Sequence, residues 1–183
     1  MSKKMAVLLA EGFEEAEAVV PMDIAMRAGI EVTKVSVSGE ESVKGAHGIA
    51  VGTDMKLDDL DAADYDLLML PGGMPGTTNL ESTPKVAEAI NRMNEKRGYI
   101  AAICAAPRIL GDMGLLEGVG ATVYPGNEEH MKGAAVDMKA KAVADGRFIT
   151  ARGMGCAVEF GREIVTALVD AETAGKVLAS IQY

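Results

Sequence analysis

The chain is poor in several residue types that mark particular classes of protein. It has no tryptophan, three phenylalanines, two histidines and two cysteines among 183 residues. So few aromatic side chains argue against a flavin-binding loop, and the cysteines and histidines show no recognisable zinc spacing. No Walker-type phosphate loop occurs either. We therefore expect no cofactor and no metal.

Long apolar runs and an excess of basic charge are also missing. The first apolar run covers only residues 5–10, too short for a signal-peptide core or a membrane span, and no later stretch reaches spanning length. The net charge of −9 argues against nonspecific binding to nucleic acid or anionic membranes. Two cysteines without a secretory segment are typical of a reducing cytosol. We expect a cytoplasmic protein with no nucleic-acid or membrane partner.

The rest of the sequence is typical of a globular α/β protein. Its composition, 49% hydrophobic and 25% charged, together with the absence of repeats and linkers, predicts one domain over residues 1–183. Strand patterns cover 5–10, 30–37, 67–70, 99–103 and 121–124, with short strands within 42–51 and a hairpin formed by 136–142 and 147–151. Helical patterns cover 14–29, 84–96, 159–169 and 172–181, and a short helix precedes Gly114. Pro21 either kinks the first helix or starts a new one. This alternation predicts a doubly wound α/β sandwich with a mostly parallel central sheet.

The stretch 99–110 is the centre of the sequence, because it predicts a buried strand that turns sharply into a helix at Cys104. Small residues follow at once, Ala105 and Ala106, as a tight elbow requires. A nucleophile at such an elbow is presented at the carboxyl edge of the sheet. The nearby helix N-terminus is expected to favour its thiolate. The alternative is that Cys104 is a small buried hydrophobic residue.

Two other strand ends could contribute to a site with Cys104. Four glutamates, including Glu14 and Glu17, lie within residues 11–17, and a buried carboxylic acid there could donate a hydrogen bond to the thiolate. Each acid could equally be a solvated residue of a helical first turn. Gly72 and Gly73 follow a buried strand, and their N–H groups could form an oxyanion hole with that of Ala105. They could also simply form a turn.

The other candidate nucleophiles and bases carry weaker signals. His47 and His130 are the two histidines, and neither is adjacent to Cys104 in sequence. Each could be a surface or loop residue rather than a base. Cys156 follows a glycine-rich segment and could be a resolving thiol or an inert packing residue.

Three segments together resemble the ThiJ/PfpI superfamily, in its DJ-one branch. They are residues 11–17 (EGFEEAE), 70–73 (LPGG) and 101–107 (AAICAAP), supported by 27–32 and 150–155. The resemblance runs nearly end to end. It implies a flavodoxin-like sandwich, a single class I glutamine amidotransferase-like domain, and a homodimer.

The resemblance also assigns roles to matching residues. Cys104 would be the reactive elbow cysteine and Glu17 the protonated acid that hydrogen-bonds its sulfur. The family's backbone-donor positions match Gly72, Gly73 and Ala105. An anion or substrate pocket would be completed by further residues: Glu14, Arg27, His47, Tyr124 and Met154. Arg27 would lie near both this pocket and the dimer interface.

Three positions depart from the family's pattern. PfpI-type peptidases have a histidine directly after the cysteine, where this chain has Ala105, so a peptidase is disfavoured. Tyr124 stands where the branch has a histidine near the pocket, and a tyrosine does not act as a base near neutral pH without a large pKa shift. His47 matches the branch's pocket arginine, so anion binding would weaken or depend on pH.

The resemblance implies a cysteine-dependent glyoxalase or deglycase that acts on small dicarbonyls or their protein adducts. An alternative from another class is an oxidative-stress sensor or chaperone without turnover, in which Cys104 is oxidised to a sulfinate next to Glu17. A non-enzymatic flavodoxin-like binding module is a third possibility. The same acid–thiol pair serves the first two functions.

Overall fold

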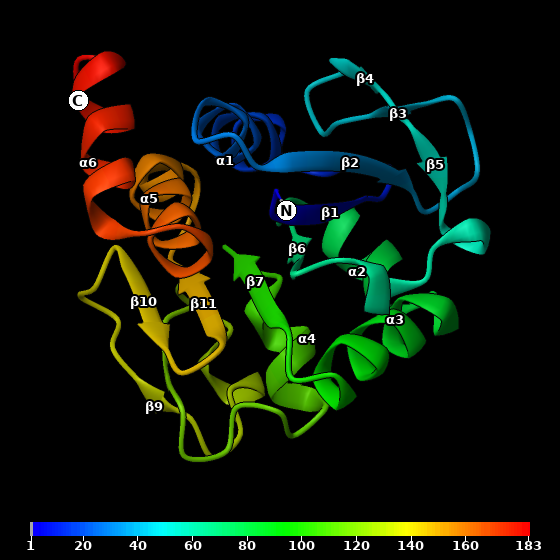
Figure 1. Cartoon of the computed structure of the whole chain (residues 1–183). Coiled ribbons are helices and arrows are strands. Elements are labelled where there is room, and N and C mark those ends of the chain that lie inside the picture. Colours follow the sequence, from blue (N-terminus) through cyan, green and yellow to red (C-terminus); the bar gives the residue numbers. More distant parts are fainter. Residues whose placement is uncertain (1) are drawn as a thin grey trace.

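A seven-stranded sheet forms the centre of the molecule. The computed structural model describes residues 2–183 (Figure 1). Neighbouring strands are parallel except at one edge, where β10 and β11 form an antiparallel hairpin. The strands follow the order β10 (Ala142–Asp145), β11 (Phe148–Ala151), β7 (Tyr99–Ile103), β6 (Leu67–Leu70), β1 (Lys4–Leu9), β2 (Glu31–Ser36) and β5 (Met55–Lys56). The predicted doubly wound α/β sandwich is confirmed.

Helices cover both faces of this sheet, as Figure 1 shows. One face carries α1 (Glu15–Arg27), α5 (Ala157–Leu168) and α6 (Ala171–Ser180), and the other carries α2 (Gly76–Glu81), α3 (Pro84–Glu95) and α4 (Pro107–Asp112). Smaller pieces are the β3 (Ser42–Lys44) and β4 (Ala50–Gly52) hairpin, the β8 (Gly120–Ala121) and β9 (Ala135–Val136) pair, and four 3-10 turns: η1 (Leu57–Asp59), η2 (Ala62–Asp64), η3 (Glu128–His130) and η4 (Met154–Cys156).

The central strands are apolar along almost all of their length because each of them faces two cores. In β1, Val7 packs in the core under α1 and α5, while Ala6 and Leu8 pack in the core under α3 and α4. All residues of β6 are buried in the same way. A continuous apolar run therefore suits a strand covered on both sides, whereas an alternating run suits one with a solvent face. Among residues 2–183, no helix is long and apolar enough to cross a membrane.

Two glycines end helices as predicted. Gly29 and Gly114 have φ of +80° and +73°, and the residue after each donates its N–H five residues back, Ile30 to Ala25 O (3.1 Å) and Leu115 to Leu110 O (3.0 Å). This is the Schellman closure that a left-handed residue permits. Pro21 lies inside a single helix, α1, and starts no new one.

Several expected boundaries are wrong. The first arm of the hairpin is β10, and not residues 136–142, because Val136 pairs with Ala121 in a separate two-stranded sheet. The Asp137 carboxylate then accepts the N–H of Lys139 (2.8 Å), which turns the chain before β10 begins. The strand expected at 121–124 is only Gly120–Ala121, and the short elements β5 and α2 were not predicted.

Candidate active site

Three loops meet at one edge of the sheet because β7, β6 and β1 are adjacent and parallel. Their carboxyl ends lead into residues 104–106, 71–75 and 10–14, respectively. Ligands in such sheets bind beyond the carboxyl ends of the strands. The segments singled out by the sequence are therefore brought together.

Cys104 stands on a strained elbow between β7 and α4. Its φ is +64°, a left-handed conformation that non-glycine residues seldom adopt. Hydrogen bonds on both sides fix it: its N–H donates to Ala151 O (2.8 Å) and its carbonyl accepts from Tyr124 N (2.8 Å). Backbone strain of this kind persists only where surrounding contacts impose it. The predicted strand-to-helix elbow is present, with the thiol half-buried.

Glu17 is the buried acid of this site. It lies in the first turn of α1, is 1% exposed and is hydrogen-bonded to Cys104. Its Oε2 also accepts the N–H of Gly72 (3.1 Å). Burial raises the pKa of the Glu17 carboxyl to about 7, and the nearby charge of Glu14 contributes, while hydrogen bonds from Cys104, Gly72 and Met154 act in the opposite direction. A carboxyl with such a pKa can give and take a proton near neutral pH.

The pKa of the Cys104 thiol depends on which member of the pair is charged. Burial raises it, and an ionised Glu17 raises it further, to about 12. The N–H groups of Ala105 and Gly73 donate to the sulfur and lower it. The two N–H donors thus favour the thiolate, in the direction predicted for the start of the helix, but while Glu17 is ionised, burial and the Glu17 charge outweigh them. When Glu17 holds the proton, its charge no longer opposes a thiolate.

The two glycines after β6 allow this close approach. A Cβ on Gly72 would lie 2.5 Å from Glu17 Oε2 and 2.6 Å from Cys104 Cβ. Gly73 has φ of +92°, and its Cβ would lie 2.2 Å from the backbone nitrogen of Glu14. Only glycine fits both positions without displacing the thiol or the acid.

Glu15 shows that burial alone does not decide whether the pKa of an acid in this region is raised or lowered. Burial raises the pKa of Glu15 too, but the His47 side chain and the N–H groups of His47 and Ile49 donate to the carboxylate and lower its pKa to about 2. Glu17, two residues further on, is buried more deeply, lies near the charge of Glu14 and has the opposite shift. The His47 partner of Glu15 and the deeper burial of Glu17 therefore separate an ionised acid from a titrating one.

An open pocket of about 490 Å³ leads down to the pair. Seven of the predicted residues line it: Glu14, Glu17, Gly73, Cys104, Ala105, Tyr124 and Met154. Gly72 lies below it, against Glu17. Four lining residues were missed by the sequence analysis: Met74, Arg108, Pro125 and Asn127. Arg108 could have been found, since it lies four residues after Cys104, one turn along the elbow helix.

Two predicted pocket residues lie elsewhere. Arg27 ends α1 and pairs with Asp23 (2.6 Å) on the surface, so its charge is not in the pocket. His47 lies outside the pocket wall, with its side chain 68% exposed. It touches the site only through Glu14, whose Oε2 is 3.6 Å from its Nδ1. The cation in the pocket wall is instead Arg108.

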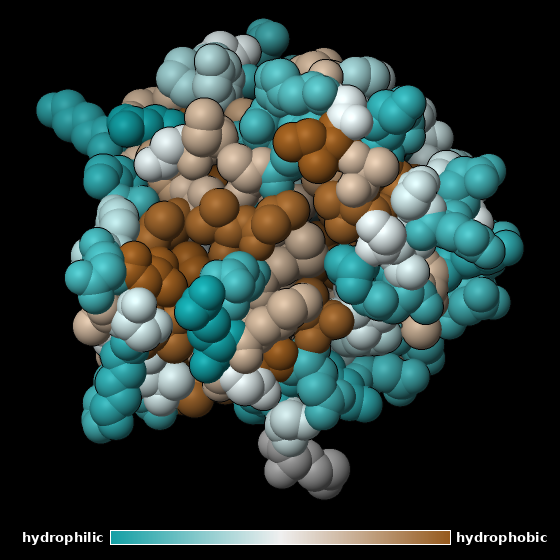
Figure 2. Space-filling model, turned by 90° about the horizontal axis from the view of Figure 1, so that it is seen from above, coloured by the Kyte–Doolittle hydropathy of each residue, from teal (hydrophilic) through white to brown (hydrophobic). Residues whose placement is uncertain are grey.

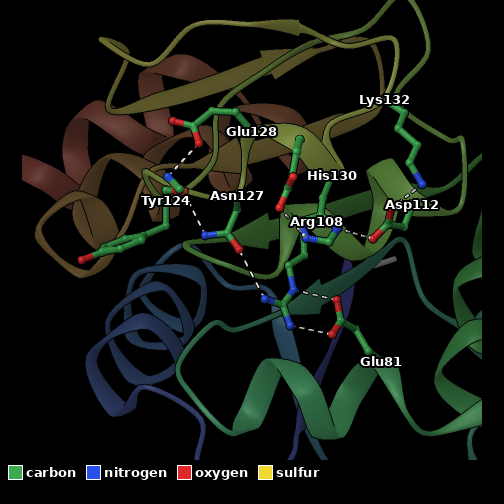
Figure 3. Close-up of polar contacts among 10 residues, drawn as sticks. Glu81, Arg108, Asp112, Tyr124, Asn127, Glu128, His130 and Lys132 are labelled. Carbon is green, nitrogen blue, oxygen red and sulfur yellow. Dashed lines mark hydrogen bonds and ion pairs between the residues drawn. The ribbon is translucent and has the colours of Figure 1, made fainter.

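Arg108 belongs to a network that joins three walls of the pocket (Figure 3). It donates to both carboxylate oxygens of Glu81 at the end of α2 (2.7 and 2.6 Å), and to Asn127 Oδ1 (3.3 Å). Asn127 in turn donates its side-chain N–H to the carbonyl of Tyr124 (3.1 Å). The helix after Cys104, the helix after the glycine loop and the 124–127 turn are thus tied together.

His47, Glu14 and Glu15 also form a group of potential metal ligands, with donor atoms within 4.8 Å of one another. The contacts within it are those of an ion pair: His47 Nδ1 is 2.9 Å from Glu15 Oε2, and the carboxylate raises the pKa of His47. His130 lies apart from this group and pairs with Asp112 (2.6 Å).

This arrangement defines a class of protein: a flavodoxin-like α/β sandwich with a cysteine elbow facing a buried glutamate. Comparison with known families gives the same answer, since the DJ-1/PfpI family matches residues 3–167. The chain belongs to the DJ-1/PfpI family, and the resemblance inferred from the sequence is confirmed.

Several relatives match over nearly their whole length. The Parkinson disease protein 7 homolog of Danio rerio is 38% identical over 184 residues, covering 98% of this chain and 96% of the relative. The crystal structure of Drosophila melanogaster DJ-1beta is 34% identical with a TM-score of 0.92, covering 100% of this chain and 98% of that one. A structure described as oxidized Toxoplasma gondii DJ-1 is 30% identical with a TM-score of 0.90, covering 100% and 99%.

Proposed function

We propose that this protein is a cysteine-dependent glyoxalase that converts 2-oxoaldehydes into 2-hydroxy acids, and that it also acts on their protein adducts as a deglycase. One observation carries the proposal. A fully buried carboxyl, Glu17, with a pKa raised to about 7, is hydrogen-bonded to a half-buried thiol at the floor of an open pocket. A nucleophile beside a proton shuttle is what this isomerisation needs.

The reaction begins when the pair places its proton on Glu17 and its charge on Cys104. The sulfur is the better site for that charge, because it is only half-buried and two N–H groups donate to it, whereas Glu17 is 1% exposed. The thiolate adds to the aldehyde carbon and a C–S bond forms. The carbonyl oxygen takes the proton from Glu17, which becomes a carboxylate, while the N–H groups of Gly73 and Ala105 stabilise the developing oxyanion.

Glu17 then moves a second proton. Its carboxylate removes the hydrogen of the former aldehyde carbon as a proton, which leaves an enediol, and returns that proton to the neighbouring carbon. The hydroxyl proton on the first oxygen passes to the second oxygen in the same rearrangement. The first carbon is oxidised to a thioester and the second is reduced to an alcohol, so no external oxidant or reductant is required. Water hydrolyses the thioester, releases the 2-hydroxy acid and restores the thiol.

The first test is turnover of methylglyoxal to lactate by the wild-type protein, Cys104→Ser and Glu17→Gln. Both substitutions should reduce kcat/KM by at least about 100-fold, the usual scale for removing a nucleophile's proton-transfer partner. Circular dichroism checks that both variants are folded. An unchanged rate in folded Cys104→Ser contradicts the proposal.

A second candidate function is a redox sensor, and the N–H groups of Gly73 and Ala105 favour it specifically. These groups already donate to the Cys104 sulfur, so they could hold the oxygens of a sulfinate there. Intact-mass measurement after limited peroxide treatment tests this role. Two oxygens should be added at Cys104 in the wild type and fewer in Glu17→Gln. Equal oxidation of both proteins contradicts it.

A peptidase is not supported by the site. A cysteine peptidase uses a histidine to activate its nucleophile. Within residues 2–183 no histidine lines the pocket, since His47 faces Glu15 and His130 faces Asp112. The residue after Cys104 is Ala105, so the local motif agrees with the geometry.

We also propose that the protein is a homodimer. Figure 2 shows apolar residues gathered across the face that is uppermost in Figure 1. The exposed apolar side chains of α1 and the β3–β4 loop are Val19, Met26 and Ile49, with 44%, 48% and 61% of their surface exposed. Light scattering should give twice the mass of the chain, and Met26→Glu should give the monomer. A monomeric wild type contradicts this assignment.

A further inference from the structure

Three exposed, largely apolar side chains line the active-site pocket. Met74, Tyr124 and Met154 are 54%, 52% and 56% exposed, and all three line the same pocket as Cys104. They come from three different segments, the loop after β6, the turn after β8 and η4. The pocket volume of about 490 Å³ lies in the range of sites that enclose drug-sized ligands. A three-carbon dicarbonyl at Cys104 would leave this wall uncovered.

Tyr124 is held in place rather than loosely exposed. Its backbone N–H donates to Cys104 O (2.8 Å), and its carbonyl accepts from the backbone and the side chain of Asn127 (3.2 and 3.1 Å). Asn127 is fixed in turn by Arg108, as Figure 3 shows, and the Tyr124 ring extends away from this network. A Cβ on Gly153 would lie 3.3 Å from Tyr124 Cδ2, so the ring rests against that glycine. The elbow and this network together position an aromatic wall.

The charged residues that line the pocket favour a substrate with an uncharged substituent. Among the lining residues that the structure describes, Arg108 is the one cation, and both oxygens of Glu81 already accept its hydrogen bonds. Glu14 also lines the pocket and is an acid. A substrate whose substituent carries a carboxylate or a phosphate would therefore find no free positive charge in the pocket wall. Aromatic rings and methionine sulfur favour contact with another ring instead.

We propose that the pocket selects 2-oxoaldehydes with an aryl substituent, and that Tyr124, Met74 and Met154 bind this substituent. The inference rests on the proposed glyoxalase activity, whose substrate class it narrows. The overall reaction of phenylglyoxal has the same atom balance as that of any 2-oxoaldehyde, with one water added. The aldehyde carbon becomes the carboxylate of mandelate, and the ketone carbon becomes its alcohol. Cys104 and Glu17 keep their roles, and Tyr124 is a specificity residue.

The ratio of kcat/KM for phenylglyoxal to that for methylglyoxal tests this preference, with initial rates followed by chromatographic assay of mandelate and lactate. Wild type should favour phenylglyoxal by at least about 10-fold, the scale of one modest apolar contact in a specificity pocket. Tyr124→Ala should reduce the ratio by a similar factor, while Tyr124→Phe, which keeps the ring, should preserve it. The control is Val169→Ala, since Val169 is 42% exposed but does not line the pocket.

A second measurement avoids both turnover and the reactivity of phenylglyoxal toward arginine. Mandelate and lactate are compared for protection of Cys104 against iodoacetamide. Mandelate should protect at a concentration at least 10-fold lower in wild type, and this advantage should disappear in Tyr124→Ala.

The two measurements distinguish a failure of the proposed glyoxalase activity from a failure of the proposed aryl preference. If neither aldehyde is turned over, the glyoxalase proposal fails, while preferential protection by mandelate still supports an aryl-binding wall. If methylglyoxal is turned over as efficiently as phenylglyoxal and Tyr124→Ala leaves the ratio unchanged, the aryl preference is overturned and the glyoxalase stands.

Discussion

The two cysteines of this chain occupy similar places in the fold and very different surroundings. Strands β7 and β11 are parallel neighbours, and each leads into a turn with a cysteine just before a helix. Cys104 has φ of +64° and a half-buried thiol hydrogen-bonded to Glu17. Cys156 has φ of −114° and lies 6% exposed in the apolar core under α1 and α5.

A cysteine at the end of a strand is therefore not sufficient to make a reactive site. Cys104 differs by its acid, Glu17, by the N–H groups that donate to its sulfur and by the pocket above it. Cys156 has the surroundings of a small hydrophobic packing residue. This favours inert packing over the resolving-thiol role that the sequence left open.

Removing each thiol should give the largest difference in activity between the two cysteine sites. Cys104→Ala should lower glyoxalase kcat/KM by about 1000-fold or more, because the covalent step is lost. Cys156→Ala should change kcat/KM by less than about 3-fold and lower the free energy of unfolding by about 1 kcal/mol, since it removes one buried atom from the core. Rates and urea unfolding curves of both variants check this. Comparable losses of activity would show that the two thiols act together.

Adding a methyl group beside each cysteine gives a smaller contrast. In Gly72→Ala the new Cβ would lie within 2.6 Å of both Glu17 Oε2 and Cys104 Cβ, so the pair must shift, and we expect kcat/KM to fall by about 100-fold. Gly155 precedes Cys156 and has open space around its Cβ position, so Gly155→Ala is the matched control and should be nearly neutral. Unchanged turnover in Gly72→Ala would mean that the spacing of the pair is not critical.

Glu15 and Glu17 of α1 should change the stability of the fold in opposite directions as pH rises. The folded pKa of Glu17, about 7, exceeds its ordinary 4.5, so the folded Glu17–Cys104 pair holds both of its protons up to about pH 7, whichever atom keeps the remaining one. The folded protein therefore binds more protons between pH 4.5 and 7 and loses stability as pH rises through this range. Glu17→Gln should therefore raise the free energy of unfolding at pH 8 by about 1–3 kcal/mol, and by little at pH 4.

Glu15 provides the matched control for this stability measurement. Its folded pKa of about 2 lies below 4.5, so its ionised form stabilises the fold above pH 4.5 and this contribution is lost as pH falls toward 2. Glu15→Gln should lower the midpoint of urea unfolding at pH 8. A shift of the same sign in both glutamine variants would contradict the contrast between the two acids.

Local patterns predicted the sheet, the elbow and the strand ends that form the site, and the family resemblance singled out Glu17 among the four acids of residues 11–17. Continuous apolar runs marked β1, β6 and β7, and adjacent parallel strands necessarily bring their ends together. Cys104, Glu17 and Gly73 could therefore be placed in one site from the sequence.

What the sequence could not give depends on contacts between distant segments. Arg27 and His47 were expected in the pocket, but Asp23 and Glu15 hold them outside it. The position of Arg108 one turn after Cys104 was a local signal, but its partners, Glu81 and Asn127, could not be predicted because they are 27 and 19 residues away in sequence. The direction of the thiol's pKa shift likewise depends on burial and on the charge of Glu17, which no local motif encodes.

The most direct test of the central claim, that the reactive pair carries its proton on Glu17 and its charge on Cys104, is the pH dependence of Cys104 alkylation. Iodoacetamide rates are measured in a Cys156→Ala background, with Glu17 and with Glu17→Gln. We predict that reactivity reaches half its maximum at or below about pH 7, and that Glu17→Gln shifts this midpoint upward because the thiolate loses its O–H donor. A rate still rising at pH 10, with a midpoint that moves downward in Glu17→Gln, would show instead that Glu17 is the ionised member and that Cys104 remains a thiol.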